Sequence, residues 1–116
     1  MPHMLLIVEP IGQREERGEA DGRVVYQQML DFTDELRAAG VLMATSSLAT
    51  AATRLQRPGG SAPRLVDGPF AEAKEMVGGF FLLDVATKDD ALAWAARCPA
   101  AAWATIEVRE TGPCFT

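Results

Sequence analysis

The chain has 116 residues, of which 48% are apolar, and its formal net charge is −5. This length fits one domain (residues 1–116), and the apolar content is that of a folded protein rather than a disordered chain. The eleven lysines and arginines are scattered among acids, which argues against a nucleic-acid-binding face. No apolar run approaches the roughly 20 residues that cross a membrane, so we expect no membrane partner.

The two cysteines, Cys98 and Cys114, form no Cys-x-x-Cys pair, which disfavours a zinc ribbon or a redox dithiol. The first residues, MPHMLLIVEP, have too short an apolar run for a signal peptide. These features predict a cytoplasmic protein with reduced thiols. We expect no metal, because His3 is the only histidine and a zinc site usually takes three or four ligands. We also expect no cofactor, because the paired glycines fit no phosphate-binding loop.

The first part of the chain predicts a strand, a loop, a helix and a second strand. Residues 4–8 (MLLIV) form a continuous apolar run that ends at an acid and a proline, as in a central strand. The polar segment 11–22 carries three glycines and predicts a loop. A helical stripe follows and ends at Gly40, a residue suited to a left-handed C-terminal position. Its members are Val25, Met29, Phe32 and Leu36. Residues 41–50 predict the second strand.

The middle of the chain predicts a hairpin and a second central strand. Residues 52–57 and 64–67 flank the turn-rich stretch RPGGSAP, which indicates two short strands joined by a turn. Residues 79–85 (GFFLLDV) form the second dense apolar run. This run is typical of a strand that is buried on both faces.

The last part predicts a helix and a strand. Thr87, with Asp90 three residues on, resembles a capping box, and Pro99 ends the helix. Residues 105–108 alternate as a final strand. The whole order predicts an α+β ferredoxin-like sandwich, with an antiparallel sheet and helices on one face. The other face needs cover, and we expect a second copy of the sheet to provide it in a homodimer.

Five stretches of the chain are distinctive in sequence and in order: LLIV, FTDELRAAGVL, DGPFAEAKEMVGGFFLLDV, ALAWAARCPAA and IEVRE. Their order is similar to that in YCII-related, DGPF-domain proteins. The chain resembles this family over nearly its whole length, and the most specific part is DGPFAE-x-KE followed by GGF. Ala73, Met76 and Val77 depart from the usual threonine, polar residue and leucine. Many members have a histidine after the Pro-Ala-Ala segment, where Trp103 or a neighbour stands here.

The resemblance implies a ferredoxin-like fold of the dimeric α/β-barrel type. It also implies a small-molecule-binding protein, because distant YCII relatives include a dehydrochlorinase to which a His–Asp pair is attributed. In this reading the chain is an enzyme that uses a pocket carboxylate for acid–base chemistry. The alternative is a non-catalytic regulatory module, since DGPF genes often lie near sigma factors of the extracytoplasmic-function type.

The DGPF stretch carries the first candidate residues. Asp67 fits a turn, where its carboxylate accepts backbone N–H bonds, and Phe70 can fill an apolar gap. Alternatively, Asp67 is a pocket carboxylate that acts as a general base, and Phe70 lines the same pocket.

The other candidates flank this stretch. Glu72, Lys74 and Glu75 read either as solvated charges on a connection or as ligand-binding residues, with Lys74 or Glu75 paired to Asp67. His3 is expected to be exposed or at a sheet edge; the alternative is a ligand-binding His–Asp dyad with Asp67. Three aromatic residues are expected at a pocket or at the dimer interface. They are Tyr26, Trp94 and Trp103.

Overall fold

The computed structural model describes residues 1–116 and contains two α-helices and six strands. In chain order these are β1 (His3–Pro10), α1 (Gln13–Ala38), β2 (Leu42–Ser47), β3 (Thr53–Gln56), β4 (Arg64–Asp67), β5 (Glu75–Leu83), α2 (Lys88–Arg97) and β6 (Thr105–Glu110). Short 3-10 turns occupy Pro58–Gly60 and Pro99–Ala102. Neither α1 nor α2 combines the length and the apolar character that crossing a membrane requires.

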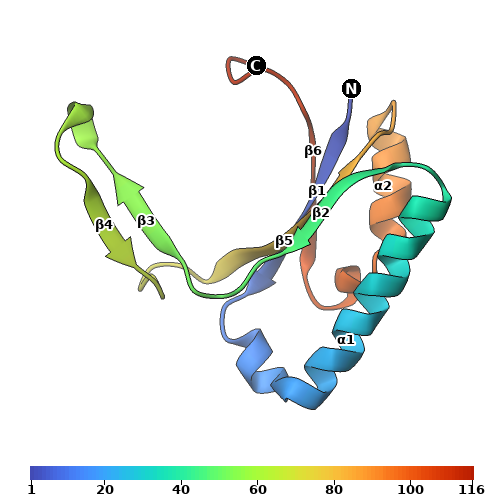
Figure 1. Ribbon diagram of the computed structural model, residues 1–116, viewed down its shortest axis with the longest axis horizontal. Helices are drawn as coiled ribbons and strands as arrows, with labels where there is room; N and C mark the ends of the chain where they lie inside the picture. The colour runs from blue at the N-terminus through green and yellow to red at the C-terminus, as the bar shows by residue number, and fades with distance from the viewer.

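Four strands form one antiparallel sheet in the order β2-β5-β1-β6. Both helices lie on the same face of this sheet (Figure 1). The predicted ferredoxin-like α+β fold is therefore confirmed. The two apolar runs form the two central strands, β1 and β5, whose alternate residues, such as Leu5 and Ile7 of β1, face the core.

The core lies between the sheet and the two helices. Leu5 of β1, Leu36 of α1 and Leu83 of β5 are fully buried there. The rings of Phe32 and Phe81 meet edge to face, with their centroids 5.3 Å apart. Phe32 and Leu36 belong to the predicted helical stripe, so the spacing of apolar residues correctly identified the buried face of α1.

The prediction of a loop at residues 11–22 is wrong, because α1 begins at Gln13. Gly12 precedes the helix with a left-handed φ of 93°, and Gly18 interrupts the helical geometry without ending it. Most other residues of the segment are good helix formers. Arg23 also pairs with Glu19 one turn earlier, at 2.6 Å. The three glycines indicate a loop, but the helix propensity of the other residues and the ion pair between side chains one turn apart stabilise a kinked helix.

The predicted helix ends are confirmed. Gly40 adopts a φ of 73°, and Val41 N–H donates to the Leu36 carbonyl at 3.2 Å, as in a Schellman motif. At the start of α2, Asp90 N–H donates to Thr87 Oγ1 at 3.1 Å.

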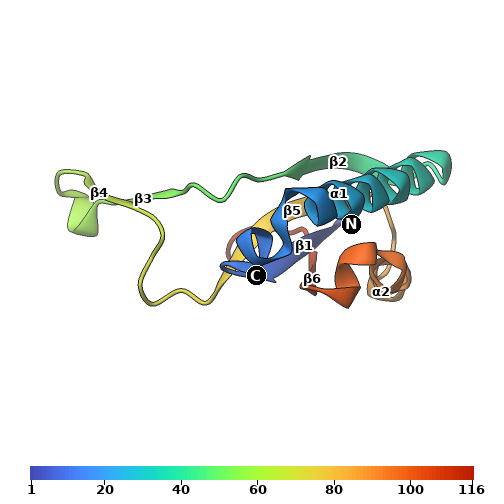
Figure 2. The same cartoon turned by 90° about the horizontal axis from the view of Figure 1, so that it is seen from below.

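Strands β3 and β4 form a separate two-stranded hairpin, which we call the arm (residues 49–67). Figures 1 and 2 show the arm extending away from the sheet and helices in both views. Every residue of the arm is exposed. The radius of gyration is 16.1 Å, whereas a compact chain of this length has one of about 13 Å. The arm accounts for this extended shape.

Candidate functional site

A cavity of about 780 Å³ lies between α1 and the sheet. Its walls come from α1 between Arg14 and Arg37, from β1, β2 and β5, and from Trp103. The side chains of Ile7 and Phe81 from the sheet and of Met29 from α1 are among its apolar lining. The cavity therefore runs along most of the length of α1.

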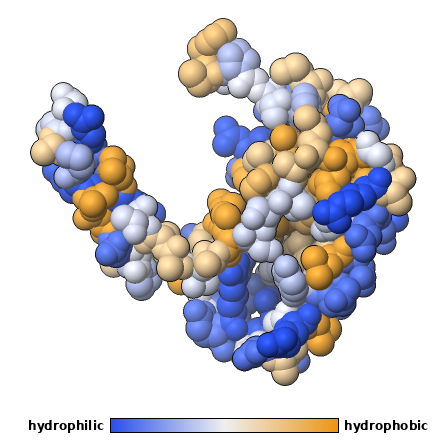
Figure 3. All heavy atoms as spheres, in the orientation of Figure 1, coloured by the Kyte–Doolittle hydropathy of each residue, from blue (hydrophilic) through white to orange (hydrophobic).

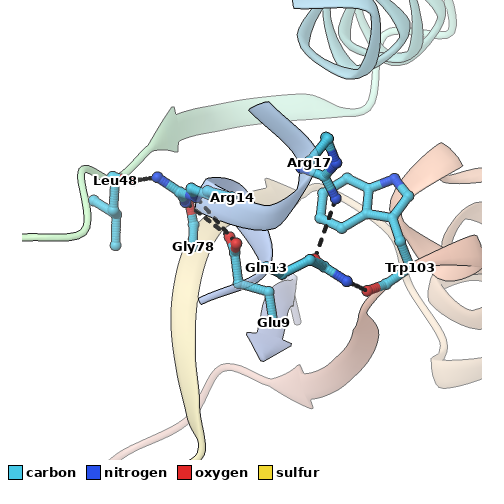
Figure 4. Close-up of polar contacts among 7 residues, drawn as sticks. All are labelled: Glu9, Gln13, Arg14, Arg17, Leu48, Gly78 and Trp103. Atoms are coloured by element: carbon cyan, nitrogen blue, oxygen red, sulfur yellow. Dashed lines mark hydrogen bonds and ion pairs between the residues drawn. The ribbon is translucent and has the colours of Figure 1, made fainter. Parts of the chain in front are cut away.

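A buried ion pair closes one side of the cavity (Figure 4). Glu9, which is only 2% exposed, accepts two hydrogen bonds from Arg14. The Arg14 Nη2 atom lies 2.7 Å from Glu9 Oε1, and Nε lies 3.0 Å from Oε2. A buried carboxylate is costly unless a cation and hydrogen bonds compensate it, and this fork-to-fork geometry supplies both.

Arg14 also joins three strands to the start of α1. Its guanidinium donates to the Leu48 carbonyl, just after β2, at 2.8 Å and to the Gly78 carbonyl of β5 at 3.3 Å. The hydrogen bonds to Glu9 are the largest cause that raises the pKa of Arg14 above its ordinary value, and partial burial opposes them. Arg14 is therefore a permanent cation whose charge and donors are already used within the protein.

Gly78 makes room for this ion pair. The pairing of β1 with β5 shifts between Ile7 and Val8, so Gly78 is the extra residue of a β-bulge. A Cβ atom added at Gly78 would overlap Glu9 Oε1 and would lie 2.8 Å from Arg14 Nη2. The first glycine of the GGF stretch thus serves the ion pair rather than strand flexibility.

Arg17 lies on the next turn of α1 and has a different environment. Its Nη2 donates to Gln13 Oε1 at 3.2 Å, and Gln13 Nε2 donates to the Trp103 carbonyl at 2.8 Å. The guanidinium carbon lies 4.6 Å from the centre of a Trp103 ring, stacked over the indole (Figure 4). The buried Trp103 Nε1 has no acceptor in the protein. These three contacts therefore fix the positions of Gln13, Arg17 and Trp103 relative to one another.

The structure gathers part of the predicted site on the arm and its base. Asp67 accepts a 2.6 Å hydrogen bond from Thr53 Oγ1 across the hairpin. Glu72 pairs with Arg54 at 2.6 Å, and the Arg54 guanidinium stacks 3.6 Å above the Phe70 ring. Hydrogen bonding to its own backbone N–H, followed by the bond from Arg54, lowers the pKa of Glu72. Asp67, Phe70 and Glu72 do not line the 780 Å³ cavity.

Lys74 and Glu75 lie where the chain enters β5. Both are exposed, and the Lys74 carbonyl accepts a 2.9 Å hydrogen bond from Ile11 N–H. Glu75 lines a shallow depression of about 320 Å³ beside Trp103. Neither side chain forms an ion pair with Asp67. The ligand-binding roles of these residues stay predictions.

The expected exposure of His3 is wrong. His3 is 2% exposed and lies on β1, a central strand. Its Nδ1 atom is buried without a hydrogen-bond partner. The alternation of β1 gives the reason, because His3 falls on the same face as Leu5 and Ile7. His3 does not line the cavity, and the structure shows no contact between His3 and Asp67.

Two of the three aromatic residues expected at a pocket or a dimer interface lie at the cavity, whereas Trp94 packs against the core. Tyr26 and Trp103 line the cavity. Trp94 instead packs edge to face against Phe32 at 6.4 Å, beneath the Arg97 guanidinium. Burial raises the pKa of the Cys98 thiol, so this thiol stays protonated at neutral pH. No group of three or more His, Cys, Asp and Glu side chains is arranged to hold a metal ion.

Sequence reasoning missed Glu9, Gln13, Arg14 and Arg17. One signal for Glu9 was present, because period-two alternation places Glu9 on the buried face with Leu5 and Ile7. A buried acid needs a cation nearby, and Arg14 is the first one that follows it in the chain. Treating residues 11–22 as a loop hid the helical spacing that brings Gln13 and Arg17 together.

The comparison with protein families gives a match that covers nearly the whole chain. The model of the YCII-related domain matches residues 1–113 of the 116-residue chain. A search of curated proteins finds no match. With nearly its whole length matched, the chain belongs to the family of YCII-related domains.

Proposed function

We propose that this protein binds a small molecule in the cavity between α1 and the sheet. The observation that carries the proposal is the cavity itself, because about 780 Å³ lies within the usual range of roughly 300–1,000 Å³ for ligand pockets. Its lining combines apolar side chains, such as Ile7, Met29 and Phe81, with four arginines and two glutamates. That combination suits a ligand with an apolar body and one polar end.

A thermal-shift screen of small metabolites tests this proposal with two matched variants. Val25→Trp fills the cavity, since Val25 lines it. Val24→Trp adds the same ring at a neighbouring residue that is 59% exposed and lies outside the cavity. Ligands that raise the melting temperature of the wild type by a few degrees should act equally on Val24→Trp and fail on Val25→Trp. If a ligand bound equally well to both variants, the proposal that it binds in the cavity would be wrong.

A separate form of the proposal is an enzyme in which a carboxylate outside this cavity, at the end of β4, does acid–base work. Asp67 is the proposed group, and Phe70, Glu72, Lys74 and Glu75, which follow it in the chain, are the proposed ligand contacts. His3 is not among them, because it is buried on β1 and has no contact with Asp67. The support is that Asp67 is solvent-accessible and that its one side-chain partner is a neutral hydroxyl. Asp67→Asn should abolish ligand binding or turnover if Asp67 acts on the ligand. A change in stability alone would leave Asp67 as a turn residue.

We also propose a homodimer of the dimeric α/β-barrel type. The sheet face opposite the helices carries Met4, Leu6 and Val8 of β1, with Val77 and Leu82 of β5, and no helix packs on it. An apolar sheet face of this kind is stable in water when a second layer covers it, and a second copy would bring an identical face.

The two unpaired cysteines fit a reducing, cytoplasmic location.

The second candidate function is a non-catalytic regulatory module, linked to operons of extracytoplasmic-function sigma factors. The arm favours it, because Leu55, Leu65 and Val66 are 48–64% exposed and accessible to a partner protein. The cavity-filling variant separates the two candidates. A regulatory role that depends on the arm should survive Val25→Trp, whereas a role that depends on the cavity ligand should not.

A further inference from the structure

The wall of the cavity is rich in arginines. Four arginines and two glutamates line it, a formal balance of +2 in a chain whose net charge is −5. Three of these arginines have a carboxylate partner. Arg14 binds Glu9 at 2.7 Å, Arg23 binds Glu19 at 2.6 Å, and Arg37 lies 3.4 Å from Asp34. Arg17 is the one arginine of the cavity wall that forms no ion pair.

Arg17 is also held in place before any ligand arrives. Its contacts with Gln13 and with the Trp103 ring fix the guanidinium, and Gln13 is itself fixed by the Trp103 carbonyl. One hydrogen bond to a neutral amide uses a single donor, whereas a guanidinium has five. A preorganised guanidinium loses less side-chain entropy on binding than a free one.

The surroundings of Arg17 favour an anion with an apolar body. Both carboxylates of the wall already have an arginine partner, Glu9 in Arg14 and Glu19 in Arg23. Beyond the polar edge, the cavity presents the side chains of Met29, Ile7 and Phe81. A charged pair at the edge of an apolar cavity is less screened than a pair in open water.

We infer that the ligand of this cavity is a small amphipathic oxyanion, and that Arg17 binds its anionic group while the apolar body enters the space between α1 and the sheet. This inference rests on the proposed function. Carboxylates and phosphate esters each present two oxygens that can accept two parallel hydrogen bonds from one guanidinium group. The test therefore contains both anions.

The experiment titrates ¹⁵N-labelled protein with four probes and follows the indole N–H resonances. The probes are benzoate, its neutral analogue benzamide, phenyl phosphate and inorganic phosphate. Trp103 lies in the site and Trp94 in the packed core, so the only two indole signals provide a reporter and an internal reference. We expect benzoate or phenyl phosphate to bind at least about tenfold more tightly than benzamide. The tighter of the two anions identifies the group, and inorganic phosphate should bind weakly because it lacks the apolar body.

Two variants test the role of Arg17. Arg17→Gln should reduce the preference for the anion over benzamide to about twofold or less, and Arg17→Lys should give an intermediate preference because it keeps the charge and loses the fork. Arg97→Gln is the matched control. Arg97 also lies over a tryptophan ring, 5.0 Å from the centre of Trp94, but outside the cavity. It should leave the preference unchanged.

The outcomes separate this inference from the proposal on which it rests. If benzoate, phenyl phosphate and benzamide bind equally, and Val25→Trp blocks all of them, the cavity is a binding site but the oxyanion inference is wrong. If Arg17→Gln keeps the wild-type preference, Arg17 is not the anion-binding residue and the inference is again overturned. If no probe shifts Trp103 in the wild type, both the inference and the proposed site are contradicted.

Discussion

Leu36 and Leu65 show how differently the two regions of this molecule are built. Leu36 is fully buried between α1 and the sheet, whereas Leu65 on the arm is 64% exposed. Figure 3 shows the arm as a separate lobe with hydrophobic residues on its surface. A two-stranded hairpin in water is marginally stable alone. The body is therefore stabilised by its own core, whereas the arm has no core and gains stability only from contact with another surface.

Matched truncations give the largest contrast between body and arm. Leu36→Ala should lower the free energy of unfolding by about 3 kcal/mol, because it leaves a cavity in a packed core. Leu65→Ala should change it by less than about 0.5 kcal/mol, since the side chain is largely exposed. Urea unfolding followed by circular dichroism measures both. A cost for Leu65→Ala close to that of Leu36→Ala would show that the arm is buried against a partner in solution.

Removing Arg14 should have the next largest effect. Arg14→Met leaves Glu9 buried without its cation, and we expect a loss of about 2–3 kcal/mol because Arg14 is itself about a third exposed. The double variant Glu9→Leu/Arg14→Met should regain much of this loss, since it removes the unpaired charge. Arg23→Met is the control, because the Arg23–Glu19 pair is more than three-quarters exposed and should matter little. An Arg14→Met protein as stable as the control would contradict the structural role of the ion pair.

The open sheet face should matter for assembly rather than for folding. Val77→Glu places a charge on this face at a residue that is 43% exposed, so we expect it to weaken self-association about tenfold with little change in circular dichroism. Sedimentation equilibrium measures the association. Leu92→Glu, at a residue of α2 that is 45% exposed, is the control on the body. A monomeric wild type would contradict the proposed dimer directly.

The smallest effect concerns Glu72 at the base of the arm. Its folded-state pKa is lowered from 4.5, so its contribution is present above that value and is lost as the pH falls through the lowered pKa. NMR titration should show this pKa below its ordinary range. Arg54→Ala should raise the pKa only part of the way back, because the backbone hydrogen bond is the larger cause. A full return would mean that Arg54 is the dominant cause.

The body could be predicted from the sequence because its signals are local and repeated. The alternation in β1, the stripe ending at Leu36 and the cap at Thr87 each reflect one buried face or one helix end. The helical stretch before Gly22 could not be predicted in this way, because its three glycines indicate a loop, and the pairing of Glu19 with Arg23 exists only once the helix has formed. The hairpin itself was predicted, but nothing in its pattern indicates that it stands away from the sheet.

The candidate site could not be predicted in the same way. It depends on contacts between segments that are far apart in the chain, such as Gln13 with Trp103 and Arg14 with Gly78. The DGPF stretch is distinctive in sequence, but its residues form a local cluster on the arm and its base, away from the cavity. A cavity is a property of the space that side chains leave empty, and no single stretch of sequence encodes that space.

The bulge at Gly78 makes three distant positions interdependent. A side chain at position 78 is incompatible with the carboxylate of Glu9, and that carboxylate is stable in its buried place only with Arg14. Across related chains, we therefore expect these positions to change as a set. A relative that loses the acid at position 9 becomes free to carry alanine at position 78, whereas a relative that keeps the acid and the arginine must keep glycine there.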